Sequence, residues 1–192
     1  MPTKINYLLG IFLSLAILIF SKPSFALNNP ELLPEVNSPV LDLAKILSPK
    51  QKEVLEENLN TIENESGWKI KYLSQFESNP GIAIKDYWNL DETSLLIVAD
   101  PRGGNLLNFN VGEAYFSFLP RLFWVELQTR FGNQYYVRDN GEDGAVLDAI
   151  NSVKVCLERG GCQVVPGFTK EQYIWTLCTS ILGGLVAGFS AA

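Results

Sequence analysis

The sequence predicts an α/β sandwich built around a small mixed sheet, followed by one C-terminal transmembrane helix. Helical and strand patterns alternate along the chain, which is typical of an α/β fold. Residues 95–99 (LLIVA) form a continuous apolar run, as expected of a central strand that is covered on both faces. Residues 172–192 carry no charge. At 1.5 Å per residue they extend about 30 Å, the thickness of the hydrocarbon core of a bilayer.

The first 26 residues are predicted to be a cleavable signal peptide. Lys4 supplies the basic start, residues 7–20 form the apolar stretch, and Ser24-Phe25-Ala26 has small residues at the two positions that a signal peptidase recognises. An apolar stretch of about 14 residues is short for a membrane span, which disfavours the alternative of an uncleaved anchor.

Together the two ends predict a single-pass membrane protein that is attached through the C-terminal helix, with its domain outside. Gly184 and Gly188 form a GxxxG pattern, which would let two such helices approach closely and self-associate.

Between the ends we expect an extended lead-in over residues 27–39 and one domain over 40–168. Ser48, Pro49 and Gln51 have the pattern of a capping box with proline at the first helical position, so a helix should begin here. Asn140 is the expected cap of the last helix of the domain. The other expected elements are a strand over 68–72, a short helix over 82–88, a returning strand over 107–111 and an aromatic helix over 120–131.

Composition excludes several kinds of chemistry. The chain has no histidine, which removes Ser-His-Asp and Cys-His catalysis and zinc sites that need histidine. Its 21 acidic residues outnumber 15 basic ones, which disfavours nucleic acid as a partner. No cofactor is required by the sequence. Any bound metal would be a hard cation held by carboxylates, such as calcium or magnesium.

Cys156 and Cys162 lie at the end of the last predicted helix and after its glycine turn. In an oxidising compartment such a close pair is expected to form a structural disulfide, with two free thiols or a redox switch as alternatives. Aromatic side chains concentrate between residues 115 and 136. They are expected to pack in the core, and an exposed part of the cluster could instead dock a protein.

Several segments resemble the TPM-domain family, in particular its cyanobacterial and chloroplast members of the thylakoid lumen. The similarity covers about residues 38–165. It is carried by these segments: Val40-Leu41-Asp42, Ile46-Leu47-Ser48-Pro49, Glu65-Ser66-Gly67-Trp68-Lys69, 95–100 (LLIVAD), 108–112 (NFNVG), 123–128 (FWVELQ) and 140–143 (NGED).

The resemblance implies an α/β/α sandwich in a thylakoid lumen or periplasm, tethered here to the thylakoid or plasma membrane. It also implies a role in the assembly or repair of photosystem II, as a factor that binds proteins such as photosystem II subunits. The alternative is a divalent-cation-dependent acid phosphatase in the thylakoid lumen, because some relatives are described as phosphatases with a carboxylate-rich site.

The candidate catalytic residues for that alternative are Asp42, Asp100 and Asp91, of which Asp42 and Asp100 are also the candidate metal ligands. Asp100 follows the central strand, where ligands bind in open α/β sheets, and Asp42 is the early aspartate of the family. Asp91 and Glu92 lie in the loop that leads into the same strand, at the end opposite to Asp100. The alternative explanation is that Asp100 begins an Asp-Pro turn and that Asp42 caps a local bend.

Overall fold

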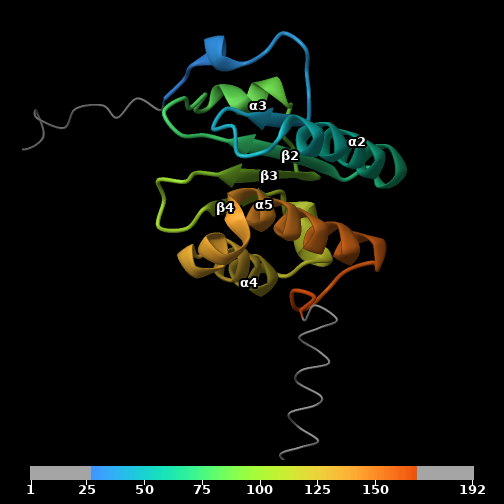
Figure 1. Ribbon diagram of the computed structural model, residues 1–192. Coiled ribbons are helices and arrows are strands. Elements are labelled where there is room, and N and C mark those ends of the chain that lie inside the picture. Colours follow the sequence, from blue (N-terminus) through green and yellow to red (C-terminus); the bar gives the residue numbers. More distant parts are fainter. Residues whose placement is uncertain (1–26, 168–192) are drawn as a thin grey trace, which may run out of the picture.

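The computed structural model describes residues 27–167 of the chain (Figure 1). Helices and strands alternate through the first half of the domain, and helices dominate the second half. In chain order the elements are η1 (Pro30–Leu32), β1 (Val40–Asp42), α2 (Pro49–Ser66), β2 (Lys69–Ser74), α3 (Ala83–Tyr87), β3 (Ser94–Ala99), β4 (Leu107–Val111), η2 (Glu113–Ser117), α4 (Arg121–Phe131) and α5 (Gln134–Glu158).

The four strands form one mixed sheet in the order β1-β2-β3-β4. The sequence predicts a small mixed sheet but neither β1 nor this order. β1, β2 and β3 are parallel, and β4 returns antiparallel to β3. In this register Asp42 is opposite Ser74, and Ser74 is opposite Ala99. The carboxyl ends of the three parallel strands therefore meet at one edge of the sheet.

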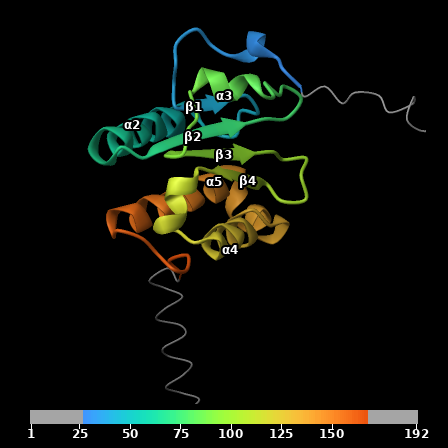
Figure 2. The same ribbon diagram turned by 180° about the vertical axis from the view of Figure 1, so that it is seen from behind.

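Each face of the sheet has its own apolar core. Helices α2, α4 and α5 cover one face, where Tyr72, Ile97 and Phe123 are fully buried. The short helix α3 covers the other face with Ile84 and Trp88. Figures 1 and 2 show α3 and the lead-in on one side of the molecule and α4 and α5 on the other. Successive side chains of β2 and β3 point to opposite faces of the sheet, so the apolar ones divide between the two cores.

The capping box predicted at the start of α2 is confirmed. The Gln51 amide donates to the Ser48 hydroxyl at 3.3 Å, and the Ser48 amide donates to Gln51 Oε1 at 2.8 Å. Gly67 ends the helix with a φ of 76°, in the left-handed region that favours glycine.

The last helix differs from its prediction at its start. α5 begins at Gln134, where the side chain of Asn133 accepts from the amides of Tyr135 and Tyr136. Gly141 interrupts the helix with a φ of 81°. Asn140 does not act as the expected cap, because its side-chain amide donates backwards to the carbonyl of Tyr136. It closes the turn before the break instead of opening the turn after it.

The predicted fold class is corrected in one respect, the transmembrane helix. Within residues 27–167 no helix is long and apolar enough to cross a membrane. The predicted span, residues 172–192, lies outside the described residues, as do Gly184, Gly188 and the predicted signal peptide over 1–26. The structure therefore supports a mixed α/β domain, and the membrane is withdrawn as a predicted partner.

Candidate functional site

Asp42 ends β1 at the carboxyl edge of the sheet, where it holds the loop that leads into α2. Its carboxylate accepts from the amide of Ile46 at 3.0 Å and from that of Leu47 at 2.9 Å. It also accepts from the hydroxyl of Ser74 on β2. Because both carboxylate oxygens already have protein donors, Asp42 acts in this structure as the cap of a bend.

Asp100 follows β3 at the same edge and begins a turn. Its carboxylate accepts from the Arg102 amide at 3.0 Å, from Arg102 Nε at 3.3 Å and from Gln75 Nε2 at 3.3 Å. Burial alone would raise the pKa of Asp100, but these hydrogen bonds and the charge of Arg102 outweigh it and lower the pKa. The carboxylate is therefore ionised and paired with a cation of its own turn.

The fold brings Asp42 and Asp100 to one edge but does not join them. They lie on β1 and β3, with β2 between them. The last residue of β2 and its successor bind one carboxylate each: Ser74 donates to Asp42, and Gln75 donates to Asp100. Sequence reasoning did not find these two residues. The available signal was their position at the end of a buried strand that adjoins both aspartates.

Tyr72 is a further buried polar residue near this edge that sequence reasoning missed. Its side chain is fully buried, and its hydroxyl has no hydrogen-bond partner among the described residues. The neighbouring Ser74 hydroxyl already donates to Asp42 and accepts from the Ala44 amide. Burial raises the pKa of Tyr72, and the negative charges of Asp42 and Glu142 raise it further.

Asp91 lies at the opposite edge of the sheet and does not join the other two aspartates. It forms an ion pair with Lys69 at the start of β2 and accepts hydrogen bonds from Thr93 and Ser94. The bonds from Lys69, Thr93 and Ser94, in that order of importance, lower the pKa of Asp91. Its role is to order the loop that enters β3.

The carboxylates at the sheet edge do not gather into a site for a divalent cation. Within residues 27–167 no group of three or more His, Cys, Asp or Glu side chains could hold a metal ion. The oxygens of Asp42 and Asp100 are occupied by protein donors, and Arg102 places a positive charge beside Asp100. A hard cation bound here would have to displace these donors and take most of its oxygen ligands, about six or more, from water.

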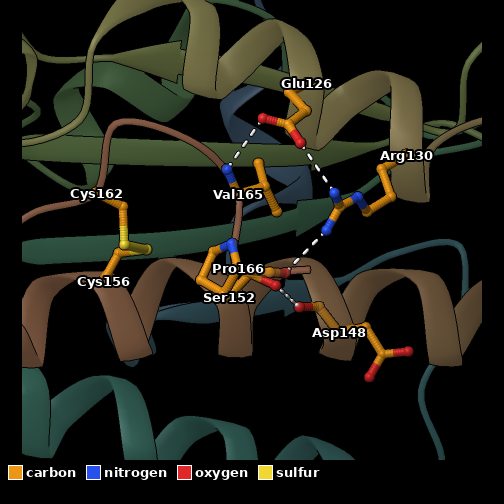
Figure 3. The surroundings of a disulfide bond; sticks show 8 residues. All are labelled: Glu126, Arg130, Asp148, Ser152, Cys156, Cys162, Val165 and Pro166. Atoms are coloured by element: carbon orange, nitrogen blue, oxygen red, sulfur yellow. Dashed lines mark hydrogen bonds and ion pairs between the residues drawn. A yellow bond between two sulfur atoms is a disulfide. The ribbon is translucent and has the colours of Figure 1, made fainter. Parts of the chain in front are cut away.

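The predicted disulfide between Cys156 and Cys162 is confirmed, with an S–S distance of 1.99 Å and a Cα–Cα distance of 5.4 Å. It joins the end of α5 to the segment over residues 162–167, here called the strap (Figure 3). Glu126 on α4 accepts from the strap amide of Val165 at 3.0 Å, and Arg130 donates to the Pro166 carbonyl at 2.8 Å. The strap is thus held on both α4 and α5.

The aromatic cluster is mainly a core feature, as expected. Phe123, Trp124 and Phe131 are buried. Apolar side chains on the outer side of this region are nevertheless exposed, with Leu122 at 66% and Val125 at 59%. These two residues, here called the α4 patch, are three positions apart and share one face of the helix.

Comparisons with known proteins show a relative in sequence and likenesses in fold among solved structures. No family model matches the sequence. The chloroplast protein "Thylakoid lumenal 15.0 kDa protein 2" of Arabidopsis thaliana is 37% identical over 150 residues, which cover 78% of this chain and 67% of the relative. The solution NMR structure of the N-terminal domain of a P. gingivalis protein has a TM-score of 0.56 and 16% identity, covering 70% of this chain and 94% of that one. The second likeness shows the fold alone.

Proposed function

Because the chain belongs to the family of the thylakoid lumenal 15.0 kDa protein 2, we propose that it works in a thylakoid lumen as a protein-binding factor with a TPM-type domain. Its partners are subunits of photosystem II during assembly or repair, as the sequence resemblance implies. Residues 1–26 serve as the signal peptide for export. The disulfide supports this location, since disulfides persist in oxidising compartments and are rare in the cytosol.

The α4 patch is the observation that carries the protein-binding role. Leu122 and Val125 are large apolar residues that remain more than half exposed although the neighbouring Phe123 and Trp124 are buried. Exposed apolar side chains that share one face of a helix are typical of surfaces that contact other proteins. Arg121, which begins the same helix, also stays exposed and gives the patch a polar rim.

The test is capture of photosystem II subunits by the chain over residues 27–192. We expect wild type to capture them and Leu122→Asp/Val125→Asp to lose capture, because two carboxylates would have to be desolvated at the contact. The matched control is Asn60→Asp/Thr61→Asp, which adds the same charge at exposed positions of α2 and should retain capture. Absence of capture by wild type, or equal capture by all three proteins, would contradict the proposal.

The acid-phosphatase alternative is supported by the shared sheet edge of Asp42 and Asp100. It requires at least one of these carboxylates to exchange its present hydrogen bonds for substrate or cation contacts. Turnover of a phosphate ester at acidic pH, with and without calcium, tests it on the same chain. Turnover that is abolished by Asp100→Asn would favour the phosphatase over a role in protein binding alone.

A further inference from the structure

An apolar groove runs between α2 and α5, away from the α4 patch, with a volume of about 310 Å³. Its apolar lining comes from Leu55, Leu59 and Ile62 of α2 and from Leu147 and Ile150 of α5. Figures 1 and 2 show that the two helices run side by side in the same direction. Val54 on the wall of the groove is 48% exposed, so the groove is open to solvent along α2.

The charge of the groove is opposite to that of the whole chain. The chain has 21 acidic and 15 basic residues, yet among the described residues that line the groove only Lys50 and Lys154 are charged. Lys50 is in the first turn of α2, where the helix dipole adds to its positive charge and which itself holds no acidic residue. Within residues 27–167 Lys50 has no ion-pair partner, and Lys154 has only Glu158 at 3.9 Å.

The two lysines mark opposite ends of the groove. The hydrogen bond between Gln51 and Asp143 places the first turn of α2 level with residue 143 of α5. Lys154 lies 11 residues further along α5, and Lys50 lies one residue before Gln51. The offset is therefore about 12 residues, and at 1.5 Å per residue the two positive charges are about 18 Å apart along the helix direction. This is the rise of roughly three turns of a third helix.

We propose that this groove binds an amphipathic helix of a partner protein that carries carboxylates at both ends of its apolar stripe. The apolar stripe packs against Val54 and Leu147, the partly exposed apolar residues of the groove, whose floor is formed by buried side chains such as Leu59. Carboxylates about 11 residues apart pair with Lys50 and Lys154. This inference rests on the protein-binding function proposed above and adds the chemistry of the partner. An open groove suits a helix better than a small amphiphile, since small-molecule sites bury most of the ligand surface.

The probe is a synthetic helical peptide with two Glu residues about 11 positions apart and Leu residues between them on the same face. A second peptide carries Lys in place of Glu. Binding to the chain over residues 27–192 is measured by fluorescence anisotropy and mapped by NMR amide shifts. We expect only the Glu peptide to bind to wild type, with shifts on α2 and α5.

Charge reversal separates recognition from folding. We expect Lys50→Glu/Lys154→Glu to bind the Glu peptide about tenfold more weakly than wild type and to bind the Lys peptide, which wild type does not. Lys45→Glu/Lys85→Glu, a control at exposed positions outside the groove, should leave the preference unchanged. A glutamate at position 50 complements the dipole of α2, so Lys50→Glu should unfold at an equal or higher temperature than wild type.

Four results would overturn the inference: no peptide binding, shifts outside α2 and α5, equal weakening by the control pair, or binding of laurate in the groove without binding of the peptide. These results leave the capture of photosystem II subunits through the α4 patch intact. If the peptide behaves as expected but no subunit is captured, the groove is supported and the proposed photosystem role is contradicted.

Discussion

The side-chain amide of Gln51 donates a 2.8 Å hydrogen bond to the carboxylate of Asp143, 92 residues further along the chain. The same side chain accepts from the Ser48 amide with its oxygen and so closes the capping box of α2. Gln51 therefore joins the start of α2 to the regular part of α5 that follows the break at Gly141. This bond is the main cause that lowers the pKa of Asp143.

Gln51→Glu keeps the capping box and removes the link between the helices. Glutamate can still accept from Ser48, but it places a second carboxylate against Asp143. We expect the free energy of unfolding at pH 7 to fall by about 1–2 kcal/mol, measured by urea titration. Gln51→Glu/Asp143→Asn should recover most of this loss, because an asparagine amide can donate to the glutamate. Equal destabilisation of both variants would contradict the proposed link.

This pair also shows how far the sequence could predict the fold. The capping box at Ser48 spans four residues and was predicted correctly, because the partners are local. The partnership of Gln51 with Asp143 depends on how two distant helices pack, which no local pattern reports. The same limit applies at the sheet edge: the sequence placed Asp100 after a buried strand, but Gln75 is its partner only because β2 adjoins β3.

The part of α5 before Gly141 and its cap at Asn133 were not predicted, for a different reason. Asn133 and Asn140 both have the residue type of a helix cap, and each precedes residues that can be helical. The side-chain amides of both residues donate backward, but only the side-chain oxygen of Asn133 accepts from the amides that follow it, and the sequence does not record this difference. The apolar stripe of α5 lies in the core, where Val146, Ala149, Ile150 and Val153 are buried.

Asp91 should make the stability of the domain depend on pH. Hydrogen bonds from Lys69, Thr93 and Ser94 hold its folded-state pKa below its value in the unfolded chain. The stabilisation is therefore present above a pH of about 4 and is lost as the pH falls through the lower folded-state pKa. We expect Asp91→Asn to be less stable than wild type at pH 7 and to approach it as the pH drops below about 3.

Urea titrations at several pH values test this prediction. The side chain of Asp91 is 44% exposed, so solvent screening keeps the effect modest. Asp86→Asn is the matched control, because its carboxylate makes no hydrogen bond within the described residues. A constant difference between wild type and Asp91→Asn over the whole pH range would show that the carboxylate does not act through its charge.

The disulfide should contribute measurably to stability. Cys156 and Cys162 are six positions apart in the sequence, and closing so short a loop in the unfolded chain is expected to stabilise the domain by about 2 kcal/mol. Cys162→Ser leaves the buried Cys156 in place and should lower the free energy of unfolding by that amount. A reductant should destabilise wild type equally and leave the variant unchanged. An unchanged wild-type unfolding midpoint after reduction would contradict the prediction.

Arg130 should control the local opening of the strap. Its guanidinium donates to the Pro166 carbonyl at 2.8 Å and to Glu126 at 2.9 Å, and Glu126 in turn accepts from Val165 (Figure 3). Arg130→Met keeps the apolar stem and removes these donors. We expect about tenfold faster hydrogen exchange at the Val165 amide, with about 1 kcal/mol lost in global stability. Arg138→Met, which breaks an exposed pair with Asp139, should change neither quantity.

Tyr72 and Tyr115 are both fully buried, yet their hydroxyl groups differ in hydrogen bonding. Tyr115 donates to the carbonyl of Lys69 at 3.4 Å, whereas Tyr72 has no partner within residues 27–167. Tyr72→Phe removes a buried polar group that makes no hydrogen bond, so the free energy of unfolding should stay constant or rise by about 1 kcal/mol. The free energy of unfolding of Tyr115→Phe should instead be lower than that of wild type by about 0.5–1.5 kcal/mol. If Tyr72→Phe is destabilised as much as Tyr115→Phe, the Tyr72 hydroxyl has a partner in solution, such as a buried water molecule.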